Sequence, residues 1–253
     1  LAYDQALFVT FVAGLLLWGA TRSRRRDLRV HDGFLLVAST WVVLPLFGAL
    51  PLLAYIPELR FTDAYFEAVS GLTATGATVL TGLEHLPISI NLWRTFMHWV
   101  GGMGVIVLVV AILPLLGIGG RQLYKAEVPT PMKDASLTPR IAETAKGLWL
   151  TYVLLTVACG LCLWWAGLEG WDAVIHAFSI AGLGGFSHKA ASLGHFANLH
   201  VELVTMVFAL LAGLNYATHY LALTRRSTRP YARDPEIPFY FGVLAASTVM
   251  LTI

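Results

Sequence analysis

Two short stretches of the chain combine glycine with hydroxyl residues in a pattern that suits cation binding by main-chain carbonyl groups. They read "TATGAT" at residues 73–78 and "GLGGFS" at residues 182–187. Gly76 and Gly185 lack a Cβ and so let the backbone turn its carbonyl groups to one side, a conformation that glycine reaches most readily. Rings of such carbonyls can replace the water around a bare cation, as they do in channel selectivity filters.

Polar side chains around these stretches fit the same chemistry. The hydroxyl groups of Thr73, Thr75, Thr78 and Ser187 can add oxygen ligands or hold the backbone from behind. Acidic residues are predicted to lie at the outer mouth, where they would raise the local cation concentration; they are Asp63, Glu67, Glu84 and Asp172. An N-cap on a short helix is the simpler interpretation of Asp63 and Asp172. A lone glycine usually serves a turn or a close helix contact, but two glycines at matching places favour the filter.

The composition requires that these stretches lie within a membrane. Of 253 residues, 57% are hydrophobic and 13% are charged, against about 25% charged in soluble domains. An all-α integral membrane protein is therefore expected. No patch for nucleic acid is present, because every basic cluster borders an apolar segment. Cys159 and Cys162 lie in one apolar run and are predicted to pack within a helix, since a structural zinc site needs four ligands.

Five apolar runs are long enough to cross about 30 Å of hydrocarbon, at residues 2–20, 33–56, 95–118, 147–168 and 202–224, and a sixth begins near Ile237. The successive connections between them hold 5, 2, 5, 1 and 4 basic residues, with Arg60 and Arg94 counted in the second. The positive-inside rule places the three rich connections in the cytoplasm. Because residue 1 is leucine and Ile253 lies inside an apolar run, we expect a piece of a longer polypeptide.

Each of the two outward connections carries a shorter apolar stretch, at residues 62–72 and 171–181. Eleven helical residues reach only about 16 Å, so each stretch can enter the membrane half-way and must then return. Non-helical backbone at that depth is tolerated only where protein buries it or it lines a wet cavity. The sequence therefore predicts two re-entrant loops, in which a short helix is followed by irregular backbone.

The two re-entrant loops match at an offset of 109 residues, which relates Asp63 to Asp172, Ser70 to Ser179 and Gly76 to Gly185. Both loops enter from the same side, which predicts a parallel repeat around a central path. The predicted parts are a leading span with a basic loop (1–30), a first repeat (31–120), a cytoplasmic loop (121–139), a second repeat (140–224), and a loop with the start of a third repeat (225–253). The glycines of "WVGGMGVIVLVVA", Gly101, Gly102 and Gly104, are predicted to allow close helix packing.

Four blocks of the sequence resemble the Trk/Ktr/HKT superfamily of potassium transporters. They are "SGLTATGATVL", "HWVGGMGVIVLVVAILPLLGIGG", "RIAETAKGLWLTYVLLTVACGL" and "GGFSHKAASLG". The resemblance covers essentially the whole chain. It implies four successive units of span, pore helix and span in one polypeptide, of which this chain would hold two. It also implies multi-pass location in the bacterial inner membrane, a homodimer, and a TrkA-like cytoplasmic ring of nucleotide-binding regulatory subunits.

By this resemblance, the chain contributes to potassium translocation and K⁺ binds to main-chain carbonyls of both stretches. The implied ion-binding residues are Ala74, Thr75, Gly76, Leu183, Gly184 and Gly185. The implied supporting residues are Thr73, Ala77, Thr78, Phe186 and Ser187. No organic cofactor is implied. Two positions depart from the family pattern: Ala74 stands where threonine is usual, and His188 follows Ser187 where threonine is usual.

Two other functions remain open from the sequence. A non-conducting membrane scaffold would tolerate Gly76→Ser and Gly185→Ser without a change in ion flux. An intramembrane hydrolase is the other possibility, because Ser70 and Ser187 lie near the re-entrant loops with histidines close by. Neither serine sits in a G-x-S-x-G elbow, and no H-E-x-x-H motif is present. We therefore expect no enzyme.

Overall fold

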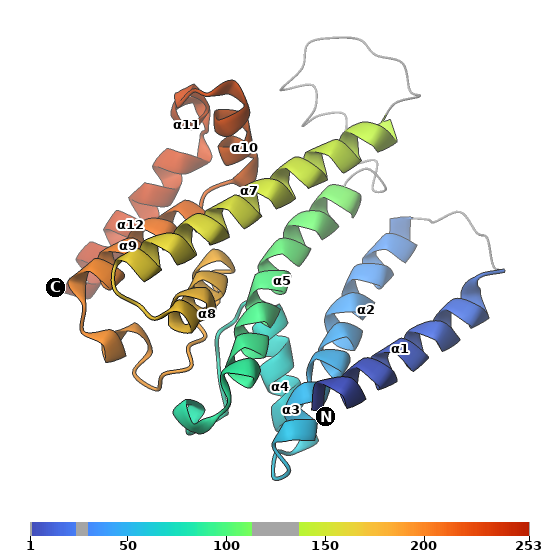
Figure 1. The fold of residues 1–253 in the computed structure, drawn as a ribbon. Helices are drawn as coiled ribbons and strands as arrows, with labels where there is room; N and C mark the ends of the chain where they lie inside the picture. The colour runs from blue at the N-terminus through green and yellow to red at the C-terminus, as the bar shows by residue number, and fades with distance from the viewer. Residues whose placement is uncertain (1, 24–29, 113–136, 253) are drawn as a thin grey trace.

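The computed structural model describes residues 2–23, 30–112 and 137–252, which are mostly helical with no β-strand among them. Most of the predicted basic loop after the first span, and the predicted cytoplasmic loop at residues 121–139 up to residue 136, lie outside these described residues. Figure 1 shows the helices in chain order. They are α1 (Ala2–Thr21), α2 (Val30–Gly48), α3 (Leu50–Tyr55), α4 (Phe61–Leu72), η1 (Leu83–His85), α5 (Ile88–Ile112), α7 (Leu137–Trp165), α8 (Gly170–Ala181), η2 (Ser192–Phe196), α9 (Leu199–Ala212), α10 (Tyr216–Arg225), α11 (Arg229–Arg233) and α12 (Glu236–Thr252).

Several helices have the length and hydrophobicity of membrane spans. Within the described residues, three helical stretches qualify, at Ala2–Thr21, Phe34–Tyr55 and Ala145–Trp165. α9 and α10 together would make a fourth. Large apolar side chains such as Leu16, Trp18 and Trp165 lie exposed on these helices, as expected for surfaces that face lipid instead of water.

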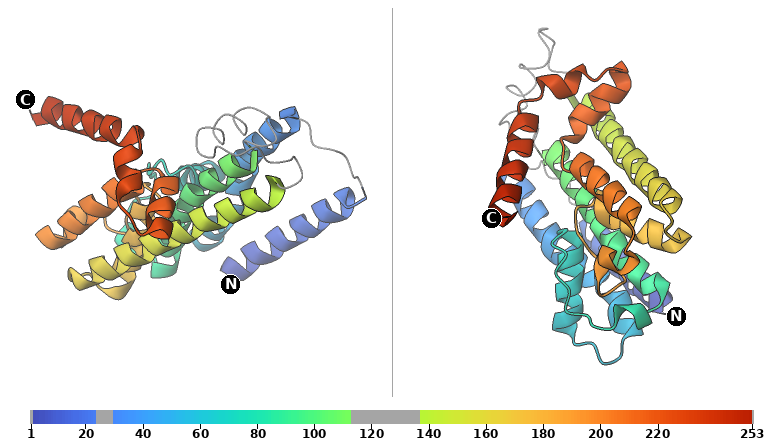
Figure 2. Two further views of the ribbon diagram at one scale, coloured as in Figure 1. Left: turned by 90° about the horizontal axis from the view of Figure 1, so that it is seen from above. Right: turned by 90° about the vertical axis from the view of Figure 1, so that its left-hand side faces the viewer.

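The two short helices are present where the sequence predicts them. α4 and α8 contain 12 residues each, and both lie between longer helices, α4 beside α2 and α5, and α8 beside α7 and α9. α5 also packs against α8 and so joins the first half of the chain to the second. Figure 2 shows the same arrangement from above and from the side, with α1 and α12 at the margins.

Each short helix is held in its own apolar core. The first core places Ala64, Ala68 and Leu72 of α4 against Leu52 and Met97. The second core is built in the same way around α8; its members are Ala173, Ala177, Ile180, Cys159, Leu163, Leu168 and Val201. Small residues at matching places let both short helices approach their neighbours closely. Cys159 is buried in the second core, in agreement with the packing role predicted for it, whereas Cys162 is only partly buried.

The predicted fifth span is not one straight helix. α9 ends at Ala212, α10 begins at Tyr216, and the two helices meet at an angle of 95°. Asn215 caps α10 by accepting a hydrogen bond from the Ala217 N–H group, and a Cβ on Gly213 would collide with the Tyr240 ring. Residues 215–220, "NYATHY", interrupt the hydrophobic run at the bend, and the predicted span passed over this signal. The 14 residues of α9 span about 21 Å, which is short of a full crossing.

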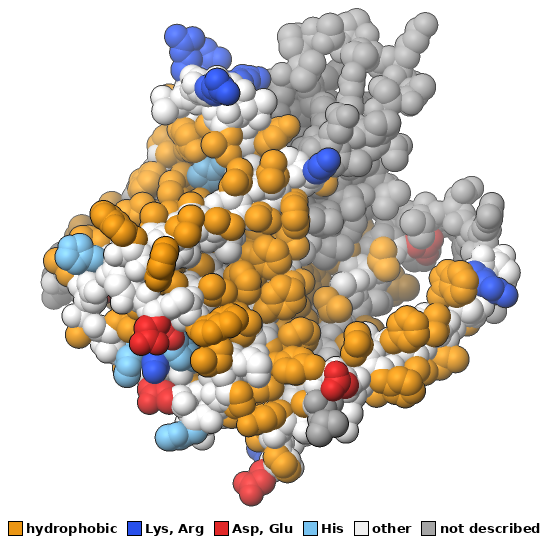
Figure 3. Space-filling view, in the orientation of Figure 1, with side chains coloured by type: hydrophobic (Ala, Val, Ile, Leu, Met, Phe, Trp, Pro, Cys, Tyr) orange, Lys and Arg blue, Asp and Glu red, His pale blue; other side chains and the backbone are white. Residues whose placement is uncertain are grey.

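The third span begins earlier than predicted. α5 starts at Ile88 instead of residue 95, so Arg94 lies inside a helix and not in the outer loop. Its side chain is 0% exposed. The outer connection therefore holds one basic residue, Arg60, instead of two. The excess of basic residues in the inner connections, on which the positive-inside rule depends, is correspondingly larger. In Figure 3, Lys and Arg side chains gather at the upper end over α10 and α11, and most acidic side chains of that face lie along the lower edge.

Two of the three glycines predicted to permit close packing in α5 do so. A Cβ on Gly101 would collide with the carbonyl group of Leu72 at the end of α4, and a Cβ on Gly102 would lie 2.9 Å from the Tyr152 hydroxyl and 3.0 Å from Gly182 Cα. Gly104 differs, because a Cβ there would meet nothing within 4 Å. Gly101 therefore sets how closely α5 approaches the end of α4.

The different surroundings of Gly101 and Gly104 predict different stabilities for alanine variants at these two positions of α5. Gly101→Ala should destabilise the protein by about 1–3 kcal/mol, the usual cost of overpacking, because the obstacle is backbone. Gly104→Ala should be neutral or stabilising by up to about 1 kcal/mol, since alanine loses less entropy than glycine in a helix. Thermal unfolding of the detergent-solubilised protein measures both. Equal melting temperatures for the two variants would contradict the packing described for Gly101.

Candidate functional site

The irregular segments after α4 and α8 have the same hydrogen-bonded backbone. We name residues 73–78 the first segment and residues 182–187 the second segment. The Ala74 N–H group donates to Gly71 O at 3.0 Å, and the Leu183 N–H group donates to Ile180 O at 3.0 Å. One residue later, Thr75 N donates to Ser70 O at 2.9 Å and Gly184 N to Ser179 O at 3.0 Å. The 109-residue offset of the sequence therefore recurs in the hydrogen bonds.

Left-handed residues occur at matching places in both segments. φ is +54° at Ala74 and at Leu183, and it is +76° at Gly76 and +84° at Gly185. Positive φ was expected of the glycines, but it costs a residue with a side chain about 1–3 kcal/mol and persists only where the surroundings enforce it. The two segments therefore share the same pattern of left-handed residues.

The two segments lie against each other. A Cβ on Gly76 would collide with the carbonyl oxygen of Gly184 and would lie 3.8 Å from Gly185 Cα. The fold therefore brings together residues of the two predicted ion-binding sets that are far apart in the chain. Gly185, in contrast, has open space where its Cβ would be. A glycine is needed at position 76 for close approach as well as for its conformation.

Both segments are fixed from behind by a side chain of the short helix that precedes them. Thr78 Oγ1 donates to Glu67 Oε1 at 2.9 Å in the first segment. Ser187 Oγ lies 3.1 Å from His176 Nε2 in the second, and these two residues are the 109-residue counterparts of Thr78 and Glu67. Thr78 and Ser187 are both among the residues for which the sequence predicts a supporting role. Ser70 adds a bond to Ala77 O at 2.6 Å.

Glu67 was expected at the outer mouth, but its side chain lies inside the protein. Its side chain is 0% exposed and forms an ion pair of 2.6 Å with Arg94 of α5. Glu67 Oε2 also accepts from the Val79 N–H group at 3.2 Å. The expectation failed because an acidic residue of a short helix was assumed to face water, and the buried arginine was assigned to a loop. A charged residue next to an apolar run is a signal that could have revealed the pair.

Asp63 and Asp172 do not cap their helices. The N-cap residues are Arg60 and Glu169, and both aspartates occupy the third helical position, where the helix dipole favours negative charge. Asp63 pairs with the exposed side chain of Arg60 at 2.9 Å. Asp172 Oδ1 lies 2.9 Å from His188 Nε2 in the loop beyond the second segment. Burial lowers the pKa of His188, although Asp172 opposes that shift.

A histidine that sequence reasoning did not assign lies directly behind the second segment. The ring of His98 stacks on Phe186 with 4.0 Å between centroids, and it is 0% exposed. A Cβ on Gly184 would collide with this ring. His98 therefore limits the side chain at position 184 and supports the second segment from α5.

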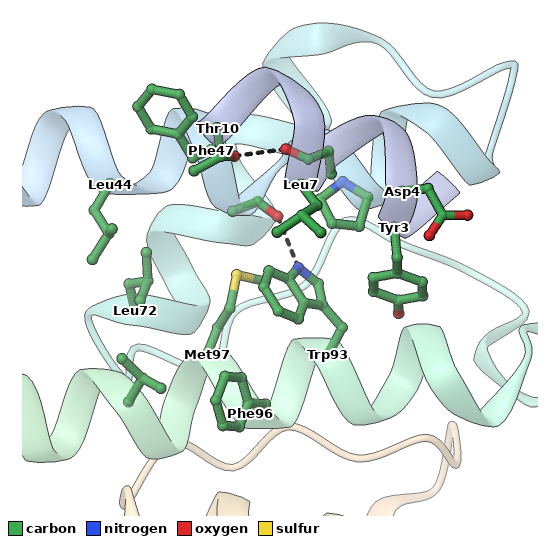
Figure 4. Close-up of a pocket in the computed structure, with 14 residues that line it drawn as sticks. Tyr3, Asp4, Leu7, Thr10, Leu44, Phe47, Leu72, Trp93, Phe96 and Met97 are labelled. Atoms are coloured by element: carbon green, nitrogen blue, oxygen red, sulfur yellow. Dashed lines mark hydrogen bonds between the residues drawn. The ribbon is translucent and has the colours of Figure 1, made fainter. Parts of the chain in front are cut away.

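An apolar cavity lies apart from this site. It measures about 450 Å³ and lies between α1, α2, α3 and α5, as Figure 4 shows. Its wall includes Leu44, Phe47, Phe96 and Met97, and the Trp93 indole N–H group, also in the wall, donates to Gly48 O at 2.9 Å. Such a wall supplies few oxygen ligands for a cation. Leu72, at the end of α4, borders the cavity.

No cluster of three or more histidine, cysteine or acidic residues that could hold a metal ion occurs in the part of the chain that the structure describes. Among the groups that the two segments bring close together is a main-chain carbonyl, that of Gly184 beside Gly76. Carbonyl oxygens are groups that can replace the hydration water of a monovalent cation.

Known proteins resemble this chain over its whole length. The family model TrkH, described as a cation transport protein, matches residues 2–253. The Trk system potassium uptake protein TrkH of Escherichia coli (strain K12) is 48% identical over 253 residues, which cover 100% of this chain and 52% of that protein. The Trk system potassium uptake protein TrkG of the same strain is 40% identical over 257 residues, covering 98% and 53%.

A solved structure matches the fold. The crystal structure of the potassium transporter TrkH from Vibrio parahaemolyticus superposes with a TM-score of 0.84 at 41% identity, covering 97% of this chain and 50% of that chain. The chain thus spans about half the length of the curated relatives it matches. The predicted resemblance is confirmed, and this chain belongs to the TrkH family of cation transport proteins.

Proposed function

We propose that this chain forms part of a potassium-conducting path, in which carbonyl groups of the first and second segments bind dehydrated K⁺. The observation that carries the proposal is the contact of Gly76 with the Gly184 carbonyl group, between two segments of matching backbone. The relatives are named potassium uptake proteins. The proposed ligands are the carbonyl groups of Ala74, Thr75, Gly76, Leu183, Gly184 and Gly185.

The free-energy cost of removing water from the ion requires several oxygen ligands instead of one. Moving an unpaired ion into a medium of low dielectric costs on the order of 20 kcal/mol by an idealised Born estimate. A single carbonyl group cannot offset that cost, whereas rings of several can. The short helices add to the effect, because each ends beside its segment and directs the partly negative end of its dipole towards it.

We further propose that the two halves of the described chain are repeat units of one pore, with boundaries at residues 31–120 and 140–224. The shared backbone of the two segments and the paired cores around α4 and α8 support equivalence. Two further units would complete a ring of four, in keeping with relatives of about twice this length. The multi-pass chain is assigned to the bacterial inner membrane.

Partner binding is proposed for the basic end of the molecule. Arg225, Arg229 and Arg233 line a hollow of about 260 Å³ with Ser227 and Pro230, at the end where basic side chains gather in Figure 3. A TrkA-like nucleotide-binding ring on this face, and a homodimer in the membrane, are the proposed assemblies. Anchoring by the positive-inside rule explains the same arginines without a partner.

A hydrolase is the second candidate, because Ser187 and His176 are within hydrogen-bond reach at 3.1 Å. His176 Nδ1 lies 2.7 Å from Asp172 O; the carbonyl must accept, so Nε2 is left to accept from the serine. The same contact recurs between Thr78 and Glu67 in the first unit, where no histidine is present. A shared structural role explains both contacts, whereas catalysis explains one.

Complementation tests the proposed function. A bacterial host that lacks its own potassium uptake should grow at low K⁺ when it expresses the gene product that carries this chain, and it should take up Rb⁺. Ser187→Ala should weaken uptake, and Ser187→Thr should preserve it because the hydroxyl group remains. Growth without Rb⁺ uptake, or no growth despite membrane insertion, would refute conduction and favour a scaffold. Loss of a lipid or peptide hydrolysis activity in Ser187→Ala would favour the enzyme.

A further inference from the structure

Arg94 and Glu67 form a fully buried ion pair behind the two segments. Both side chains are 0% exposed. Arg94 Nη2 and Nε lie 2.6 Å and 2.7 Å from Glu67 Oε1. An arginine within an apolar helix is expensive in a membrane and is usually functional.

Arg94 contacts both segments at once. Its Nη2 donates to Thr78 Oγ1 at 3.2 Å, at the end of the first segment. Its Nη1 donates to Ser187 O at 3.2 Å, at the end of the second, and to Asn91 Oδ1 at 3.1 Å. The guanidinium carbon also lies 4.4 Å from the centre of the Phe186 ring. One rigid planar group thereby fixes the distance between two segments that are 109 residues apart in sequence.

Stability alone does not account for such a pair. Removing two charges from water costs several kcal/mol per ion, and apolar replacement of a buried pair is often neutral or stabilising. The fork of Arg94 instead provides fixed geometry, because guanidinium donors are planar and directed. Lysine, a single flexible point charge, could not make the same set of contacts.

The pair occurs at one of the two equivalent places. At an offset of 109 residues, the counterpart of Arg94 on α9 is Leu203, and the counterpart of Glu67 is His176. His176 fixes Ser187 directly, and Leu203 is an exposed apolar residue. Within the described chain, the charged connection therefore belongs to the junction between the first and second segments and is not a general feature of the repeat.

We infer that Arg94 and Glu67 are positioning residues that set the spacing of the first and second segments and thereby the preference for K⁺ over Na⁺. The inference rests on the proposed function, because the segments matter only if they bind the ion. A fixed spacing favours the larger ion, whereas segments free to close would also fit the smaller one. Glu67 has a second effect: it neutralises Arg94, whose charge would otherwise repel cations from the site.

Conservative variants separate geometry from charge. Arg94→Lys retains the charge but not the fork, and it should lower the Rb⁺ to Na⁺ uptake ratio roughly tenfold, as expected from loss of a hydrogen bond to a charged group. Thr78→Val removes the bonds of Thr78 to Arg94 and to Glu67 but keeps the ion pair, so it should lower the ratio less, and Thr78→Ser should preserve it. The control is Arg60→Gln, because Arg60 and Asp63 form an exposed pair that should contribute little. Uptake is normalised to the amount of protein in the membrane.

The sign of the charge gives a second readout. Glu67→Gln leaves a guanidinium group that keeps its charge, since arginine is not deprotonated in proteins. Arg94→Gln leaves a carboxylate, which can take up a proton when buried. Glu67→Gln should therefore raise the half-saturating Rb⁺ concentration more than Arg94→Gln does. A purely structural pair would produce no such order among variants that reach the membrane.

The double variant Arg94→Gln with Glu67→Gln completes the test. Membrane levels closer to wild type than those of Glu67→Gln, together with a reduced Rb⁺ to Na⁺ ratio, would support the inference. A wild-type ratio in the double variant and in Arg94→Lys would overturn it. Gly76→Ser, measured in parallel, distinguishes failure of this inference from failure of the proposed filter. If Gly76→Ser alters selectivity and the Arg94 variants do not, the inference fails and the proposed filter stands; if none does, the filter itself fails.

Discussion

Replacing Gly76 by serine should lower the preference for potassium over sodium by about tenfold or more. Two effects add at this position. Its φ of +76° strains any residue with a side chain, at about 1–3 kcal/mol, and its Cβ would collide with the Gly184 carbonyl group. The new side chain must therefore displace a proposed ligand of the second segment. Uptake of Rb⁺ and Na⁺ in a host that lacks potassium uptake measures the ratio.

Gly185→Ser should have a smaller effect in the same assay. Position 185 carries the conformational strain, with φ of +84°, but a Cβ there meets nothing within 4 Å. Gly194→Ala is the control, because Gly194 has open space and no positive φ. Equal selectivity in Gly76→Ser and wild type, with normal membrane levels, would remove Gly76 from the site. A larger effect at Gly185 than at Gly76 would contradict the contact between the segments.

The second large effect is expected at Gly184. Gly184→Ala should reduce Rb⁺ uptake at least several-fold, because its Cβ would collide with the His98 ring. That ring cannot easily yield, since it is buried and stacked on Phe186 at 4.0 Å. The second segment would move instead, away from α5. Overpacking of this kind typically costs about 1–3 kcal/mol.

A second substitution tests this cause directly. His98→Ala removes the obstacle and should restore much of the uptake that Gly184→Ala loses, although His98→Ala alone weakens the support of Phe186. Residues in contact give coupled effects, whereas distant residues give additive ones. Additive losses in the double variant would show that His98 does not limit the position of the second segment.

The sequence predicted the elements that hydropathy and spacing determine. The short helices, the 109-residue match of their ends and the two glycines with positive φ were all expected. Helix boundaries were less well determined. Arg94 was assigned to a loop because a charge beside an apolar run was taken to end it, and only the acidic partner on another helix makes its burial possible. The bend after Gly213 was missed because one long span was assumed, although residues 215–220, "NYATHY", interrupt the apolar run there.

The remaining features depend on tertiary contact. Positive φ at Ala74 and Leu183 follows from hydrogen bonds back to the ends of α4 and α8, and neither residue type favours it. His98 lay in a predicted span with no sign that it would face Gly184. Glu67 and His176 differ in chemistry but hold equivalent hydroxyl groups. Their equivalence could be recognised only once the offset of the repeat was combined with the geometry.

The central claim is that main-chain oxygens of both segments bind one dehydrated cation. Crystals of the full protein soaked in Rb⁺, with its position taken from anomalous scattering, test it most directly. We expect Rb⁺ within coordination distance of carbonyl oxygens from residues 74–76 and from residues 183–185 together. Rb⁺ bound only by side-chain carboxylates, or by one segment with the other facing away, would contradict it.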